Sequence, residues 1–454
     1  MKQTNATTKD LANLVFKKLQ GAKVSSALPN QATLENLFEN LFYASIKTEE
    51  SDFIKVTVTL IDSKNPDPSP PKRIVKDRWN YIPFGEPIPF NVKNIVKLSK
   101  AADPWSSSLA VDFDSKGELH IWGMIDQAVH YQSFLHYEAE SGPEQAGLFQ
   151  TSVTGIGSLV VIFDYELIAT LKQNVLISNY LEVFNSGTIA EILKGHNEAF
   201  RDKLTSYIKK EFPSEDEAMW HSYFHSLWTQ SLSRILIKIQ NYQHGGAFLI
   251  TEDFKSDLDI KHKITYDRLN NSVCNLTKLS ISNYSFSNLI NQEFIEQDLT
   301  IPIDLYLDEA ISNFTKDETR AELKGAIRFI ASLSCIDGLV VMSPELKVKG
   351  FGTVIRNIEL PPHIFLSKSS KVVVNKLVKV SPNNFGTRHR SMFSYCWKHE
   401  GSVGFVVSQD GDIRIITKVG TRLVMWENVK VQQLFKSRKL KDIKLPKIKK
   451  VDIR

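Results

Sequence analysis

The chain has 454 residues, enough for two or three domains, and its 42% apolar and 24% charged residues are typical of a globular protein with hydrophobic cores. No apolar run reaches the roughly 18–20 residues that span a bilayer, and the N-terminus lacks the apolar core of a secretion signal, so we expect a cytoplasmic protein. The formal net charge of +5 is weak evidence for anionic partners, and three widely spaced cysteines indicate neither a disulfide framework nor a metal knuckle.

Residues 1–75 are expected to form a helical segment that ends in a linker. The stretch 64–73 is rich in proline and predicts an extended loop or linker. Apolar residues recur at helical spacing near the N-terminus and predict an amphipathic helix; they are Leu11, Leu14, Val15 and Leu19.

Short strands are predicted within residues 76–187. The β-like runs lie at 106–113, 117–125, 158–163 and 166–171, and each pair is separated by a turn sequence. The sequence therefore predicts a compact, mostly β domain in this part of the chain.

Helical periodicity returns at 188–219, which we expect to be a helical connector, and continues in a long helix over 217–242. A glycine pair, Gly245-Gly246, then precedes a buried strand that runs to Ile250. The third domain is expected to span 220–435.

Within this third domain, Thr315 and Glu318 have the spacing of a capping box and predict a helix over 317–334. Its expected core stripe consists of Leu323, Ile327, Ile330 and Leu333. The following strands are predicted at 336–343, 402–409 and 412–417. An Asn/Ser-rich stretch at 270–298 is interpreted as an insertion, which extends to about residue 316.

These elements predict an α/β (α+β) protein. Its C-terminal mixed β-sheet is flanked by helices, and a separate, mostly β domain and a helical connector precede it. A basic tail at 436–454, with nine Lys/Arg against two Asp, ends the chain. The tail is either a solvated, disordered segment or a weak contact for nucleic acid, acidic protein or a membrane surface.

Two clusters carry residues suited to chemistry: Asp337-Gly338 at the head of a strand, and 386-GTRHRS-391 before a helix-like stretch. Gly386 at a helix start offers backbone N–H groups to phosphate. The guanidinium groups of Arg388 and Arg390 suit phosphate oxygens, and Thr387 and Ser391 add hydroxyl donors. Taken locally, a salt-bridge surface and a plain Asp-Gly turn remain alternatives.

The order of these motifs resembles the diadenylate cyclase family, whose nucleotide domain was first known from DNA-integrity-scanning proteins. The family's DGA, GTRHR and VSQ motifs correspond to 337-DGL-339, 386-GTRHR-390 and 407-VSQ-409. The segment 233–253 resembles the helix, glycine turn and first strand of that domain. The resemblance covers about 220–420.

The resemblance implies an enzyme that joins two ATP molecules into cyclic di-AMP and releases two pyrophosphates. Asp337 would bind Mg²⁺ or Mn²⁺ and orient the attacking 3′-hydroxyl. Arg388 and Arg390 would hold the triphosphate, with help from Gly386, Thr387, Ser391 and Ser408. His389, in the same motif, has either a catalytic or a structural hydrogen-bonding role. One domain binds one ATP, so a homodimer or higher oligomer with facing sites is implied.

Leu339 departs from the family, which has alanine after Asp-Gly. Alternation along a strand places Leu339 on the same face as Asp337, where it would either contact and crowd the nucleotide or pack into the core. This departure raises the alternative of an inactive nucleotide-binding sensor or switch of the same fold.

The segments 84–125 and 155–171 resemble a probable sensor domain of the DACNV type, found ahead of some bacterial diadenylate cyclases. The resemblance implies an unidentified small-molecule ligand. Trp105 and Trp122 are candidates for its pocket, with burial in the core as the alternative.

Overall fold

The computed structural model describes most of the chain, namely residues 2–21, 29–67, 70, 78–139, 143, 146–242, 244–254, 257–409 and 411–431. The basic tail at 436–454 and part of the proline-rich stretch at 64–73 lie outside the described residues. The chain divides into two compact units, Met1–Tyr180 and Leu181–Gln433. Within the described ranges, every helix is too short or too polar to span a bilayer.

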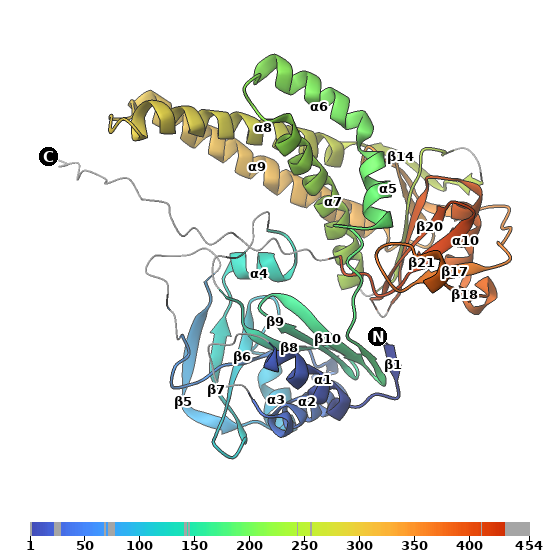
Figure 1. Ribbon diagram of the computed structural model, residues 1–454. Coiled ribbons are helices and arrows are strands. Elements are labelled where there is room, and N and C mark those ends of the chain that lie inside the picture. Colours follow the sequence, from blue (N-terminus) through green and yellow to red (C-terminus); the bar gives the residue numbers. More distant parts are fainter. Residues whose placement is uncertain are drawn as a thin grey trace. The chain divides into compact units, whose positions relative to one another are not determined.

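Unit 1 is built on a sheet of nine strands among its described residues, in the order β1-β11-β10-β9-β8-β4-β6-β7-β5 (Figure 1). Most neighbours are antiparallel, whereas β4 and β6 are parallel. The strands are β1 (Lys2–Thr4), β4 (Val56–Leu60), β5 (Asn80–Pro89), β6 (Ser107–Phe113), β7 (Leu119–Asp126), β8 (Phe149–Gly155), β9 (Ser158–Phe163), β10 (Glu166–Lys172) and β11 (Val175–Ile177), with a small separate hairpin of β2 (Thr48–Glu49) and β3 (Asp52–Phe53).

Helices cover both faces of this sheet. The main core lies between the sheet and three helices, α1 (Thr8–Gln20), α2 (Gln31–Ser45) and α3 (Val92–Ser99). A capping box between Thr7 and Asp10 begins α1, and its predicted apolar side is buried at Leu11, Val15 and Leu19. The N-terminal helices therefore share one core with the strands, rather than forming a segment apart.

A second, aromatic cluster lies around α4 (Val129–Leu135) and includes Trp79, Trp122 and Tyr131. Trp122 is buried, and its indole N–H donates to the carbonyl of Ile61 at 3.1 Å. Trp105 is 54% exposed, so burial in the core is wrong for this residue. The centroid of its ring lies 4.4 Å from the centroid of the His136 ring.

Unit 2 holds a mixed sheet of ten strands among its described residues, in the order β13-β16-β15-β12-β19-β20-β21-β17-β18, with β14 also paired to β16. The pairs β12–β15 and β17–β21 are parallel, and the others are antiparallel. The strands are β12 (Gly246–Ile250), β13 (Leu258–Asp259), β14 (His262–Tyr266), β15 (Leu339–Met342), β16 (Val348–Ile355), β17 (Ile364–Ser367), β18 (Val378–Val380), β19 (Val403–Val407), β20 (Ile413–Val419) and β21 (Arg422–Trp426). This architecture confirms the predicted fold class.

The helices of unit 2 are α5 (Thr188–His196), α6 (Glu198–Glu211), α7 (Glu217–Asn241), α8 (Arg268–Ile290), α9 (Ile303–Leu333) and α10 (Thr387–Lys398). A short π-helix follows α8 at Asn291–Ile295, and short 3₁₀ helices lie at Val374–Lys376 and Pro382–Asn384. The helical connector predicted from residue 188 consists of two helices, because Asn197 ends α5 and precedes α6. The helix α7 forms as predicted, and fourteen of its residues are buried.

The predicted insertion is helical: α8 and α9 run side by side as a long hairpin (Figure 1). The predicted capping box at Thr315 is wrong. The helix α9 begins at Ile303, directly after Pro302, and Thr315 lies inside it with its hydroxyl donating to the carbonyl of Ile311 at 2.9 Å. The predicted core stripe from Leu323 to Leu333 is buried as expected.

Candidate active site

Asp337 and Gly338 stand directly before β15, as predicted. The Asp337 side chain is 99% exposed. Gly338 has φ +114°, and a Cβ there would lie 2.5 Å from the backbone carbonyl carbon of Gly352 on β16. Glycine is required here because β16 approaches too closely for any side chain. The position of Asp337 therefore depends on this tight contact between two backbones.

The GTRHR motif opens α10, also as predicted. Gly386 is the N-cap residue, with extended backbone and no side-chain cap, and its carbonyl accepts from the N–H of Arg390 at 3.1 Å. The first N–H groups of a helix have no intrahelical partner and carry the positive end of its dipole. The first turn of α10 therefore offers donors for an anion, next to the side chains of Thr387 and Arg388.

The fold brings the two motifs together. Nη2 of Arg388 lies 3.7 Å from Oδ1 of Asp337, although 51 positions separate them in sequence (388 − 337). Both side chains are solvent-accessible, at 38% and 99%, and such ion pairs contribute little stability. This pair can therefore open readily when a phosphate or a metal ion competes for either partner.

Gly245 is a further residue of this site that the sequence reading did not single out. It has φ +68°, and a Cβ there would lie 2.9 Å from Nη1 of Arg388 and 3.2 Å from the backbone N of Gln409. The Arg388 guanidinium thus lies against bare backbone at the turn before β12. The sequence did contain a signal for Gly245, namely the pair Gly245-Gly246 at the start of a strand. An isolated or paired glycine at such a place indicates that another group approaches the backbone closely.

Arg390 differs from Arg388 in its surroundings. Its Nε atom is buried and has no hydrogen-bond partner among the described residues. A buried, unpaired donor is costly. The residue as a whole is half-buried, and its role in holding a phosphate group stays a prediction.

His389 has a structural partner, Arg414 of β20, which lies 25 positions later and carries no sequence signal. Nη1 of Arg414 donates to Nε2 of His389 at 3.0 Å, and Nε of Arg414 pairs with Glu427 at 3.0 Å. A guanidinium can only donate, so Nε2 is the acceptor and His389 is neutral. Burial, and then the charges of Arg414 and Arg388, lower the pKa of His389 to about 4. This geometry supports the structural hydrogen-bonding role.

We expect His389 to make unfolding pH-dependent between pH 6.5 and about 4. The folded chain keeps the ring neutral down to a pKa of about 4, whereas the unfolded chain takes up a proton near 6.5. The unfolded state thus binds the additional proton, so the free energy of unfolding falls as pH drops through this window, by roughly 3 kcal/mol over its full width. Denaturation of the wild type and of His389→Gln at several pH values measures the effect.

Glutamine accepts the hydrogen bond from Arg414 but does not titrate, so the His389→Gln variant should show a shallower pH dependence. Substitution of the exposed His363 by glutamine is the matched control, and it should retain the dependence of the wild type. If the free energy of unfolding changes equally with pH in the wild type and in His389→Gln, the conclusion that folding keeps His389 neutral is wrong.

The remaining predicted site residues occupy different positions. Ser408 lies in the β19–β20 turn, where its hydroxyl accepts from the N–H of Asp412 at 3.0 Å. Thr387 is exposed and Ser391 is half-buried, both on the first turns of α10. Leu339 is 6% exposed and belongs to the core cluster of Met392 and Phe393. Of the two alternatives for Leu339, the structure favours packing in the core.

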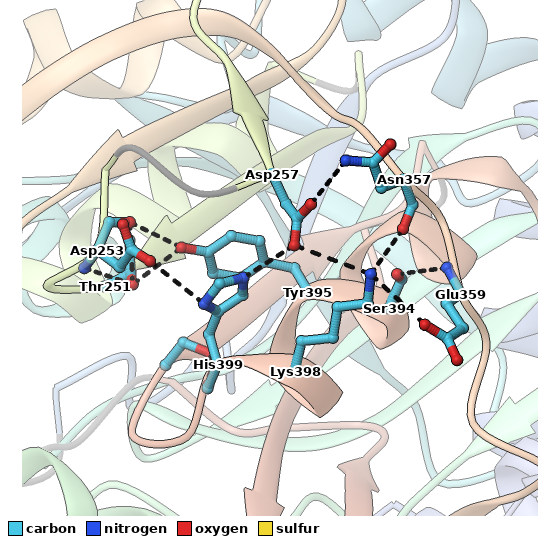
Figure 2. A network of polar contacts seen from close by, with 10 residues as sticks. Thr251, Asp253, Asp257, Asn357, Glu359, Ser394, Tyr395, Lys398 and His399 are labelled. Atoms are coloured by element: carbon cyan, nitrogen blue, oxygen red, sulfur yellow. Dashed lines mark hydrogen bonds and ion pairs between the residues drawn. The ribbon is translucent and has the colours of Figure 1, made fainter.

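A polar network anchors the other end of α10 (Figure 2). The Tyr395 hydroxyl donates to the carbonyl of Asp253 at 2.7 Å and lies 3.2 Å from Oγ1 of Thr251. Burial raises the pKa of Tyr395 to about 12, so the hydroxyl stays protonated and keeps donating. These contacts tie the last turn of α10 to the segment after β12.

Figure 2 shows that His399 lies between two carboxylates, with Nδ1 3.5 Å from Asp253 and Nε2 3.3 Å from Asp257. Asp257 also accepts from the Asn357 amide at 3.0 Å, and Nζ of Lys398 donates to the Asn357 carbonyl at 3.0 Å. The hydrogen bond from Asn357, and then that from His399, lowers the pKa of Asp257. The network positions α10, and hence Arg388 at its beginning, against the sheet.

A divalent metal ion is implied by the family resemblance. No cluster of three or more His, Cys, Asp or Glu side chains suited to a metal occurs within the described ranges. A single exposed carboxylate nevertheless fits Mg²⁺, which keeps several waters and binds through one or two carboxylates together with substrate phosphates. Asp337, exposed and beside Arg388, is such a carboxylate.

Comparison with known proteins identifies one segment. Residues 23–126 match a family described as "Probable sensor domain DACNV". The match begins within the segment predicted as helices and linker, and it does not extend into unit 2. No curated protein and no solved structure matches the chain. Unit 1 therefore carries a probable sensor domain.

Proposed function

We propose that unit 2 is a diadenylate cyclase domain that converts two ATP into cyclic di-AMP and two pyrophosphates, under the control of the sensor domain in unit 1. The observation that carries the proposal is the 3.7 Å approach of Arg388 to Asp337, which joins the two motifs of the family resemblance in one site. The sensor-family match supports the same context, because the resemblance places such sensors ahead of cyclases of this kind.

The reaction forms a bond from each 3′-oxygen to the α-phosphorus of the other ATP, and it breaks the bond to pyrophosphate. Such a transfer depends on positioning and on neutralising charge. Arg388, Arg390 and the N–H groups of α10 would hold the triphosphate, with hydroxyls of Thr387 and Ser391 beside them. Ser408 would approach the phosphates from its turn.

Asp337 would hold Mg²⁺ or Mn²⁺ and orient the 3′-hydroxyl for attack. When bound, the metal supplies Lewis-acid activation and neutralises phosphate charge. The exposure of Asp337 fits a site that a second copy completes, because a lone domain holds one ATP while the product needs two. We therefore include a homodimer, or a higher oligomer with facing sites, in the proposal.

Incubation of the purified full chain with ATP and Mn²⁺ or Mg²⁺, with products resolved by mass, tests the function. We expect cyclic di-AMP and pyrophosphate, and no product when EDTA removes the metal. ATP that stays intact but bound would instead favour the nucleotide-binding switch of the same fold. ATP that is neither converted nor bound would contradict both functions.

A further inference from the structure

Unit 2 contains a cavity of about 470 Å³ that is separate from the candidate active site. It lies between α6, α8 and the turn that follows β15, and Phe224 of α7 contributes to its wall. The volume is in the range of small-molecule pockets, about 300–1,000 Å³. Three buried apolar side chains form part of the lining; they are Phe200, Leu204 and Phe224.

The charged side chains that line this cavity are mainly cationic. Lys203, Lys278 and Lys347 line it together with one carboxylate, that of Glu345. Glu345 pairs with Lys347 at 2.6 Å and approaches Lys203 at 3.9 Å. Three positive charges against one negative leave an excess of two positive charges (3 − 1). This excess complements a phosphate monoester, which carries close to two negative charges at neutral pH.

The cavity also offers groups that suit a planar ring. The Tyr207 ring is part of the lining, and Nζ of Lys278 lies 5.1 Å from its centroid. Asn271 and Asn275 lie one turn apart on α8, are exposed, and present amides that both donate and accept. An aromatic face beside paired amides and an apolar wall can take a flat ring with a polar edge.

We propose that this cavity binds a phosphorylated small molecule with a planar ring, of the size of a nucleoside monophosphate. The ligand would lie against α6, α8 and the turn of Glu345 and Lys347, which directly follows β15. Asp337 stands before the opposite end of the same strand. The proposal concerns binding and does not depend on cyclase activity.

Titration calorimetry of the full chain with AMP, ribose 5-phosphate and adenosine tests the proposal. AMP should bind saturably, and both fragments should bind at least about tenfold more weakly, because each lacks one of the two recognised parts. The double variant Lys203→Ala/Lys278→Ala should weaken AMP binding by about tenfold or more, since two charge-assisted contacts are lost. Both lysines are exposed, so the fold should be retained.

Lys210→Ala is the matched control, because Lys210 lies on the same helix, is exposed and does not line the cavity. This variant should bind AMP as the wild type does. Arg388→Ala separates the two sites: it should weaken ATP binding at the candidate active site but leave AMP binding here unchanged. No saturable AMP binding, or AMP binding that the lysine pair does not affect, would overturn the proposal.

Discussion

Replacement of Asp337 by asparagine is expected to abolish formation of cyclic di-AMP while ATP affinity stays within about threefold. Asparagine matches the shape of aspartate but lacks the charge needed to hold a divalent metal and to orient the 3′-hydroxyl. The Asp337 side chain is 99% exposed, so folding should not suffer. Product formation by mass and ATP affinity by calorimetry provide the two readouts.

Asp308→Asn is the matched control for this experiment, because Asp308 is an exposed aspartate of α9, away from both motifs. It should retain the activity of the wild type. Full activity of Asp337→Asn would show that the proposed mechanism is wrong. A loss of ATP binding in parallel with activity would instead place Asp337 in substrate binding. Arg388→Ala should lose ATP binding and activity together, since the Arg388 guanidinium is proposed to hold the triphosphate.

Gly338→Ala is expected to destabilise unit 2 by about 2–6 kcal/mol. The substitution requires a non-glycine residue at φ +114° and places a Cβ 2.5 Å from the backbone of Gly352. Strained backbone and overpacking each cost about 1–3 kcal/mol, and here the obstructing atom is backbone that cannot rotate away. Calorimetry of the full chain measures the change in the unfolding transition of unit 2.

Gly325→Ala is the matched control, because it makes the same substitution at a position where a Cβ has free space. Gly325 lies inside α9, and a Cβ there would meet nothing within 4 Å. Alanine should stabilise the helix by about 0.5–1 kcal/mol. We therefore expect Gly338→Ala to lower the free energy of unfolding and Gly325→Ala to raise it. A stability of Gly338→Ala equal to that of the wild type would contradict the close packing of β15 on β16.

Polar contacts hold α10, whose first turn carries the GTRHR motif, near both of its ends. Arg414 fixes His389 near the start of the helix, and the network of Tyr395 and His399 fixes its end. Contacts of this kind suit the proposed cyclase reaction, because such a transfer depends on positioning more than on covalent chemistry. The polar network thus connects the packing of α10 to the proposed function.

Local patterns predicted those elements whose sequence signal is strong and self-contained. The strands β6, β7, β9 and β10 either alternate apolar and polar residues or are continuously apolar, and turn residues bound them. The helices α7 and α10 have clear start signals. The positions of these elements agree with the prediction to within a few residues. The strand β4 was missed because it lies between a helix and a proline-rich stretch, although its VTVTL sequence alternates. The start of α9 was misplaced because Thr315 imitates a cap in the middle of a helix.

By itself, the sequence determined the class of fold, the strand before which Asp337 stands and the helix that Gly386 begins, because these follow from short-range periodicity and turn chemistry. It also supplied the motif resemblance on which the proposed function depends. Only the tertiary structure decided that Arg388 meets Asp337, that Gly245 makes room for this arginine, and that Arg414 keeps His389 neutral. These relations join residues far apart in the chain, and the order of strands in the sheet, which no local pattern specifies, brings them together.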